Sequence, residues 1–191
     1  RLFGEGHWDL NELTINYRNP QEVSDLASRF AQNEGLYIST VNAVRALPDS
    51  VSRHVVDDMK ALLTVTSNQA AQLANHFVSA DGTGRIAIIC PNDLIKPVRE
   101  AVRHRLSSLM APSEYQRLID QPEWDEQISV CGTEMVKGLE FDAVIVIEPG
   151  RIEDDAPSRL VAASDLYVAT TRPTQKLVIV RTKEDERSLN I

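Results

Sequence analysis

Three short segments carry side chains that could bind a nucleotide, and each lies where a strand-like run meets a turn or a helix. The first is Asn16-Tyr17-Arg18, where Tyr17 offers a flat π surface for a base and Arg18 offers a planar fork of donors for a phosphate. Open α/β sheets bind ligands at strand ends, so this tripeptide is a candidate binding segment. The plain structural alternative is a core tyrosine beside a surface arginine.

The second segment is KGLEFD at 137–142, which leads into the apolar run AVIVI. Gly138 permits a close approach of the backbone to a ligand, and Glu140 could accept hydrogen bonds from ribose hydroxyls. The alternative is a simple turn before a buried strand. The third segment is LYVATTRPTQKLVI at 166–179, where Arg172 closes a helix and Pro173 stops it. Such an arginine commonly only partners the helix dipole, but Arg18 and Arg172 could also converge on one phosphate.

Other catalytic arrangements are missing from the sequence. It contains no Gly-x-x-x-x-Gly-Lys-Ser/Thr loop and no Gly-x-Gly-x-x-Gly after a strand, so the chain has no phosphate cradle of its own. We therefore do not expect a self-sufficient nucleotide hydrolase. The four histidines are scattered, and we predict no metal site. Cys90 and Cys131 each adjoin an apolar run, which favours buried, reduced thiols.

Composition favours one globular domain of 191 residues, with 42% hydrophobic and 25% charged residues. No apolar run approaches the roughly 20 residues of a membrane span, and a signal-peptide core is missing, so we expect a cytoplasmic protein with no membrane partner. The net charge of −8 excludes a broad basic face for nucleic acid. Residues 111–160 hold 4 basic and 12 acidic side chains and account for the whole excess.

Apolar periodicity predicts strands that alternate with helices. The expected strands are 10–17, 85–90, 128–131, 143–147 and 176–181, and the expected helices are 20–30, 55–78 (one long or two short), 93–110 and 158–170. We expect Asn19 to cap the first helix and Glu22 to complete its capping box. Residues 34–53 stay ambiguous between a short strand and a loop. Continuous apolar strands between helices indicate a parallel, three-layer α/β sheet.

Taken together, the three segments resemble the C-terminal RecA-like motor domain of UvrD/Rep-like superfamily 1 helicases. NYR corresponds to the family's motif IV, KGLEFD to motif V and VATTRPTQKLVI to motif VI, in the expected order. The resemblance implies a P-loop NTPase-like sheet without a Walker A loop. It also implies that Tyr17 stacks on adenine, that Arg18 and Arg172 contact the ATP γ-phosphate, and that Gly138 and Glu140 line the nucleotide site near the ribose.

By the same resemblance, ATP and Mg²⁺ are held mainly by an N-terminal RecA-like domain that this chain lacks, and DNA is the expected track. The chain begins at Arg1 without an initiator methionine, so we expect a piece of a larger protein. We assign residues 1–191 to one motor domain and interpret the helical segment around 93–125 as a candidate reduced insertion. The fragment alone is expected to be inactive as an ATP hydrolase.

Two departures from the family pattern keep more than one function open. The family's Thr-x-His pair, which helps contact single-stranded DNA, is replaced by Gly132 and Glu134, and a carboxylate there repels a phosphate backbone. Only about 118 residues separate Arg18 from Lys137, so the usual large insertion is reduced. Both features resemble the HelD branch, which binds and recycles RNA polymerase. A non-enzymatic interaction module and an unrelated doubly wound domain that binds a small nucleotide also stay open.

Overall fold

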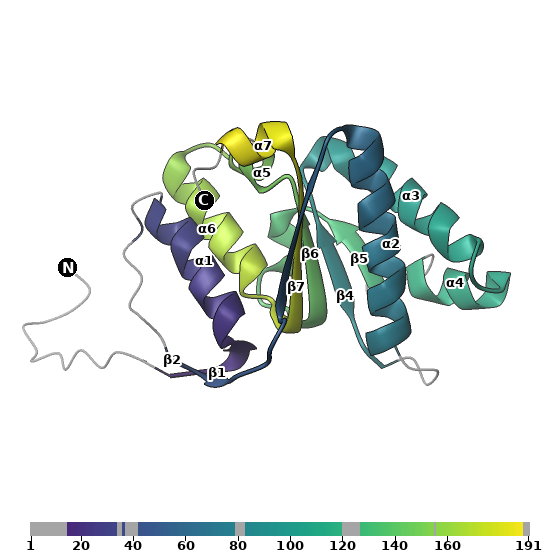
Figure 1. Ribbon diagram of the computed structural model, residues 1–191, viewed down its shortest axis with the longest axis horizontal. Coiled ribbons are helices and arrows are strands. Elements are labelled where there is room, and N and C mark those ends of the chain that lie inside the picture. Colours follow the sequence, from purple (N-terminus) through teal and green to yellow (C-terminus); the bar gives the residue numbers. More distant parts are fainter. Residues whose placement is uncertain are drawn as a thin grey trace, which may run out of the picture.

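A five-stranded parallel sheet forms the centre of the computed structural model, which describes residues 15–33, 36, 42–78, 83–119, 127–154 and 156–188 (Figure 1). In spatial order its strands are β3 (Val51–Val56), β7 (Pro173–Thr182), β6 (Phe141–Ile147), β4 (Ile86–Ile89) and β5 (Ile128–Cys131). All four pairings are parallel, so every amino end of a strand lies at one edge of the sheet and every carboxyl end at the other.

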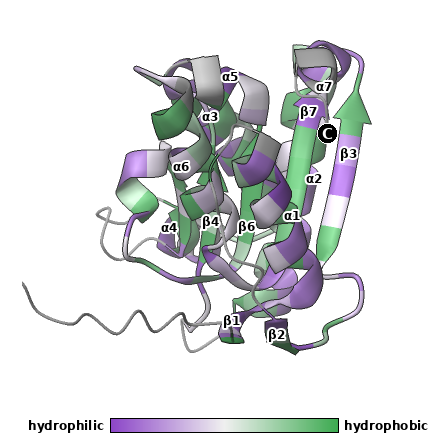
Figure 2. Ribbon diagram, turned by 90° about the vertical axis from the view of Figure 1, so that its left-hand side faces the viewer, coloured by the Kyte–Doolittle hydropathy of each residue, from purple (hydrophilic) through white to green (hydrophobic). Residues whose placement is uncertain are grey.

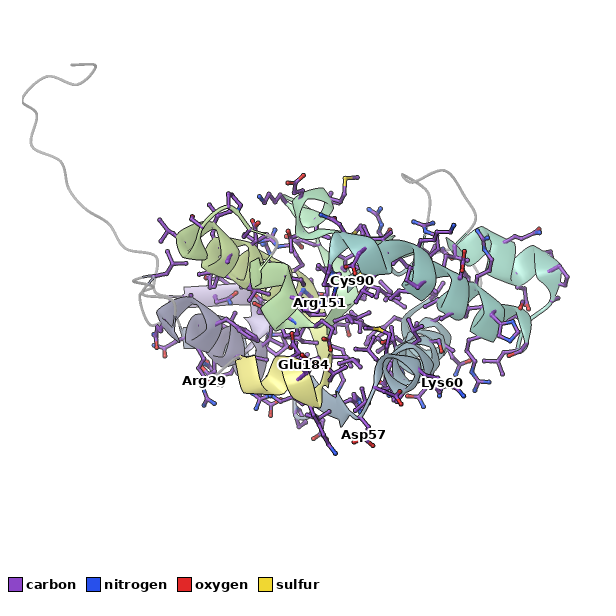
Figure 3. All side chains as sticks on the ribbon, turned by 90° about the horizontal axis from the view of Figure 1, so that it is seen from above. Arg29, Asp57, Lys60, Cys90, Arg151 and Glu184 are labelled. Carbon is purple, nitrogen blue, oxygen red and sulfur yellow. The ribbon has the colours of Figure 1, made fainter. Side chains whose placement is uncertain are left out.

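Helices cover both faces of this sheet. One face packs against α2 (Met59–Phe77), α3 (Ile95–Ser107) and α4 (Pro112–Ile119), and the other against α1 (Gln21–Asn33) and α6 (Arg159–Thr170) (Figure 1). Seen from the carboxyl edge, Arg29 on α1 and Lys60 on α2 lie on opposite sides of the sheet (Figure 3). Shorter elements complete the chain: η1 (Asn92–Leu94), η2 (Thr133–Val136), α5 (Pro149–Asp154) and α7 (Lys183–Ser188).

The alternation of side chains along a strand explains the two layers of core. In β6, Ala143, Ile145 and Ile147 join the cluster under α2 and α3, whereas Val144 and Val146 join the cluster under α1 and α6. All five side chains are fully buried. The apolar character of β4, β6 and β7 is visible as green ribbon in Figure 2. This arrangement confirms the predicted three-layer α/β fold.

A second, two-stranded parallel sheet lies beside the amino ends of the central strands (Figure 1). It pairs β1 (Ile15–Pro20) with β2 (Asn42–Arg45). The Arg45 guanidinium donates to the carbonyl of Thr174 in β7 at 2.8 Å, which ties the small sheet to the large one. β1 carries the NYR segment, so this tie brings NYR close to the central sheet.

The first predicted strand differs from the structure in where it ends, and the first predicted helix differs in its capping. Residues 10–14 of the expected strand lie outside the described residues, and the strand continues to Pro20. The predicted capping box is wrong, because the Glu22 carboxylate accepts hydrogen bonds from the Ser50 hydroxyl and the Val51 amide instead. The apolar stripe of this helix is buried as predicted, with Val23, Leu26, Ala27 and Phe30 at most 3% exposed.

The ambiguous and long segments resolve into more elements than periodicity indicated. The described part of 34–53 contributes β2 and the start of β3, and β3 extends into the region expected to be helical. The helix that follows is a single one, begun by Asp58, whose carboxylate accepts from the Ala61 amide at 2.8 Å. The predicted insertion is described as α3 and α4, which share the core under α2; residues 120–126 lie outside the described residues. Its origin as an insertion stays a prediction.

The two cysteines are free and differ in burial. Cys90 is buried, and this burial raises the pKa of its thiol to about 12. Cys131 is only partly buried, so the prediction of two buried thiols is wrong for this residue. The residues belong to clusters on opposite faces of the sheet, so their positions are explained by packing. Among the described helices, none is long and apolar enough to cross a membrane.

Candidate functional site

The candidate site lies at the amino edge of the central sheet, where β6 and β7 begin side by side. Glu140 immediately precedes β6 and Arg172 immediately precedes β7, and the first residues of these strands, Phe141 and Pro173, pair in register. Strand pairing therefore places residues 140 and 172 next to each other. Ligand sites of open sheets usually lie at the carboxyl ends, so this cluster occupies the opposite edge from that general rule.

Arg18 joins this edge from the small sheet. Its guanidinium forms an ion pair with the Glu140 carboxylate at 2.6 Å, and the two side chains are 43% and 50% exposed. The exposure leaves both groups accessible to a ligand from solvent. Segments that are more than 120 residues apart in the sequence thus meet through their charged side chains.

Arg172 is held from two directions. Its Nε donates to the carbonyl of Val168 in the last turn of α6 at 3.0 Å, and its Nη1 donates to the carbonyl of Leu139 at 3.2 Å. The first bond matches the simple role of a helix-terminal arginine. The second bond is not local, because it fixes the guanidinium against the loop that carries Glu140.

The charges of Arg18 and Glu140 both influence Arg172. Partial burial lowers the pKa of Arg172, the positive charge of Arg18 lowers it further, and the negative charge of Glu140 opposes the shift. Two guanidinium groups and one carboxylate leave a net positive charge at this point. Such a charge in an acidic chain is suited to an anion with several oxygen atoms, since each arginine presents donors in a planar fork.

Asn19 fixes the geometry of the cluster, a role that its sequence context does not reveal. Its side-chain amide is buried and donates to the carbonyl of Thr171 at 2.9 Å and to the carbonyl of Pro173 at 2.7 Å. These two carbonyls belong to the residues before and after Arg172. Asn19 therefore joins the strand of Arg18 to the backbone on either side of Arg172. Asn19 is therefore a connector between segments and not the helix cap that the sequence predicted.

Local hydrogen bonds surround Asn19, although they do not reveal its long-range contacts. Asn16 and Asn19 bracket the Tyr-Arg pair, and Asn16 Oδ1 accepts from the Arg18 amide at 2.9 Å while its Nδ2 donates to Asn19 Oδ1 at 3.1 Å. Two asparagines three positions apart can satisfy each other and the intervening backbone. The partners in the third segment, however, lie more than 150 residues away and follow no local pattern.

The remaining predicted residues flank this cluster. Tyr17 is 70% exposed, so the interpretation of a core tyrosine is wrong and its ring is accessible. Gly138 has a φ of +81°, a conformation that favours glycine, and no heavy atom of the described chain lies within 4 Å of the position a Cβ would take. The structure thus brings Arg18, Glu140 and Arg172 together, with Tyr17 and Gly138 beside them. Their roles in nucleotide binding stay predictions.

A cavity of about 660 Å³ lies next to this site, between β5, η2 and the start of α6. Its lining includes Arg85, whose guanidinium carbon lies 5.8 Å from the centre of the Phe141 ring. Lys137, paired with Asp165 at 3.0 Å, also lines it. Gly132 and Glu134, the two departures from the family pattern, belong to the same wall. Among the residues that line this cavity, Met135, Leu139 and Val161 are large apolar residues with exposed side chains.

Comparison with known proteins supports the fold. No protein-family profile and no curated protein matches the sequence. The chain is similar to the crystal structure of the C-terminal domain of a possible DNA helicase from Lactobacillus plantarum WCFS1, with a TM-score of 0.57 and 18% identity over 92% of this chain and 95% of that chain. A second structure, the C-terminal part of the Fun30 ATPase domain, has a TM-score of 0.31 and 11% identity over 95% of this chain and 89% of that chain.

The first of these similarities, together with the strand order, defines the class of fold. The chain is a three-layer α/β domain with a RecA-like parallel sheet. The second similarity is too low to add to this conclusion. An identity of 18% does not extend to activity, so function has to be inferred from the site.

Proposed function

We propose that this chain is the second motor domain of an ATP-dependent superfamily 1 helicase or translocase. In this proposal Arg18 and Arg172 contact the γ-phosphate of ATP, Tyr17 stacks on adenine, and Gly138 and Glu140 lie near the ribose. The observation that carries the proposal is that Arg18 and Arg172 lie at one exposed edge, where Arg18 pairs with Glu140 and strand pairing places Arg172 beside Glu140. The similarity to a C-terminal domain of a possible DNA helicase supports it in general terms.

The chemistry of phosphoryl transfer explains why two arginines are useful there. Negative charge spreads over the equatorial oxygens of the transferred phosphoryl group, and a cation positioned in advance stabilises that charge. Arg172 is well suited, because two backbone carbonyls already fix its guanidinium and little reorganisation is needed. A phosphate loop and most ligands for Mg²⁺ would come from an N-terminal RecA-like domain. Closure of the two domains on ATP would then drive movement along nucleic acid.

The test uses a protein in which this chain is joined to its N-terminal motor domain. Arg172→Ala is expected to lower ATP turnover by about 10³-fold or more, the magnitude of an arginine finger, while nucleotide still binds. Arg29→Ala, which removes an exposed arginine on α1 away from the site, is the matched control and should keep normal turnover. Unchanged turnover in Arg172→Ala would contradict the proposal.

The chain by itself gives a second test, which asks whether ATP hydrolysis requires the N-terminal motor domain as proposed. It lacks a phosphate loop, so we expect no ATP hydrolysis from the isolated 191 residues. Hydrolysis faster than that of an Arg18→Ala, Arg172→Ala double variant would show that the chain carries a complete active site, which would be contrary to this proposal.

A second candidate function is that of a protein-interaction module, including a HelD-like factor that binds RNA polymerase. The observation that favours it is the group of exposed apolar side chains that line the cavity, Met135, Leu139 and Val161. Capture of purified RNA polymerase by the isolated chain, and its loss in a Met135→Ser, Val161→Ser variant, would support this candidate. The motor function does not require tight binding by the chain alone.

A further inference from the structure

Glu140 forms an ion pair with Arg18, one of the two arginines proposed to bind phosphate. Its Oε1 lies 2.6 Å from Nη2 of Arg18, a distance that is close to that of a charge-assisted hydrogen bond. A phosphate oxygen that approached Nη2 of Arg18 would compete with this carboxylate for the same donor. The site therefore already contains an anion of its own.

The charge distribution explains why this carboxylate pairs with Arg18. Arg18 and Arg172 repel each other, which is one reason that the pKa of Arg172 is lowered, and Glu140 reduces that effect. Without a ligand, Glu140 is a counter-ion that reduces the repulsion between the two arginines. Once phosphate oxygens are bound, the same carboxylate is a like charge beside them.

We propose that Glu140 is an internal competitor that phosphate must displace from Arg18. This inference rests on the proposed function, since it assumes that Arg18 and Arg172 bind phosphate. A triphosphate, which can engage both arginines at once, displaces the carboxylate more readily than inorganic phosphate does. Glu140 therefore lowers the affinity of the site for anions in general and favours polyphosphates over the free phosphate that hydrolysis releases.

The exposure of the pair sets the expected size of the effect. Exposed ion pairs that have been measured contribute about 0.2 to 1 kcal/mol, which corresponds to a change in affinity of about 1.4- to fivefold. Removal of the charge of Glu140 should therefore tighten triphosphate binding by about 1.4- to fivefold at low ionic strength. The gain should shrink at high salt, because mobile ions screen exposed charges.

The experiment measures binding of tripolyphosphate and of inorganic phosphate to the isolated chain by calorimetry or NMR titration. Glu140→Gln is expected to bind tripolyphosphate about 1.4- to fivefold more tightly than the wild type, with a larger relative gain for inorganic phosphate. Glu134→Gln, the same change of charge at an exposed position in η2, is the matched control and should show less than half of that gain. Arg18→Ala and Arg172→Ala should each weaken binding about threefold or more.

The possible results separate the two proposals. If both arginine variants bind as the wild type does, or if neither the wild type nor Glu140→Gln binds tripolyphosphate, the phosphate site itself is wrong. If the arginine variants weaken binding but Glu140→Gln does not tighten it, only the competitor role is overturned. An equal gain in Glu134→Gln would also overturn it, because the effect would then reflect net charge.

A structural readout without any ligand completes the test. The Nε–Hε NMR signal of Arg18 should shift in Glu140→Gln and stay unchanged in Glu134→Gln, since only the former removes its partner. Thermal melting should show that both variants fold, because both side chains are exposed. Glu140→Ala serves as a second variant and should show the same gain in affinity.

Discussion

The two edges of the central sheet carry charge clusters of the same size and opposite sign. At the amino edge, Arg18 pairs with one carboxylate, Glu140, and Arg172 lies beside it. At the carboxyl edge, two carboxylates, Glu148 at the end of β6 and Asp185 on α7, lie with Arg181 of β7. The first cluster is partly open to solvent, whereas Glu148, Asp185 and Arg181 are only 2%, 3% and 7% exposed.

Burial decides what each cluster can do. The Glu148 carboxylate accepts from both the amide and the hydroxyl of Thr182, and Asp185 accepts from the backbone amide of Arg151 at 3.1 Å. These bonds connect the β6–α5 turn to the β7–α7 turn, and Arg151 and Glu184 on these elements are visible in Figure 3. Buried and bonded groups stabilise the fold but cannot receive a ligand. The exposed cluster contributes little to stability and stays available for binding.

The largest expected effect concerns the buried cluster at the carboxyl edge of the sheet. Glu148→Ala leaves the amide and hydroxyl of Thr182 without their acceptor in a buried place, so it should lower the free energy of unfolding by about 2 to 4 kcal/mol in urea denaturation. Glu148→Gln keeps one acceptor oxygen and should cost less. Glu140→Ala at the other edge should cost under about 0.5 kcal/mol. Equal losses at the two edges would remove the contrast between them.

The next effect concerns the buried connector at the amino edge, Asn19. Asn19→Ala removes the donors to the carbonyls of Thr171 and Pro173, and we expect a loss of about 1 to 3 kcal/mol in the free energy of unfolding. Stability is again measured by urea denaturation, and tripolyphosphate binding is measured separately on the folded protein. Binding should weaken as well, because Arg18 and Arg172 lose their common anchor. Loss of stability with unchanged binding would show that Asn19 does not position the arginines.

A smaller effect depends on pH. Burial, followed by the charge of Glu148, raises the pKa of Asp185 from 3.8 to about 6, against the opposing influence of the Arg151 and Gly150 amides and of Arg181. The folded state therefore holds this proton more tightly than the unfolded state does. Its contribution to stability is present below about pH 4 and is lost as the pH rises through about 6.

Asp185→Asn isolates this contribution. The stability of the wild type relative to Asp185→Asn should fall by about 2 kcal/mol between pH 4 and pH 7, as measured by urea denaturation at a series of pH values. Glu184→Gln changes an exposed carboxylate on the same helix and should show no such dependence. A pH-independent difference between the wild type and Asp185→Asn would contradict the buried, proton-binding character of this edge.

The sequence predicted the layers of the fold, because apolar runs such as AVIVI are buried on both faces. It also singled out Arg18, Glu140 and Arg172, which lie at one edge of the sheet, and their roles in nucleotide binding stay predictions. The features that could not be predicted from the sequence depend on contacts between residues far apart in the chain. The hydrogen bonds of Asn19 to the segment around Arg172, and the buried pair of Glu148 and Asp185, join positions far apart in the chain and have no local signature.

The short elements show the same limit. β2 and β3 exist because each pairs with a partner strand, whereas their own residues alternate weakly and gave no clear prediction. The capping box at Glu22 was a valid local pattern, but a partner in the next segment, Ser50, took its carboxylate instead. Tertiary contacts thus override local preference where a polar side chain can reach either kind of partner.

The position of β7 has a consequence for how the domain assembles. This strand is the last of the described strands along the chain, yet it lies between β3 and β6 inside the sheet. During synthesis, the other strands of the sheet emerge first, and β3 has no neighbour in this sheet until β7 arrives. The placement of β7 also brings Arg172 to the edge where Arg18 lies, so the proposed phosphate-binding residues come together only after this last strand has joined the sheet.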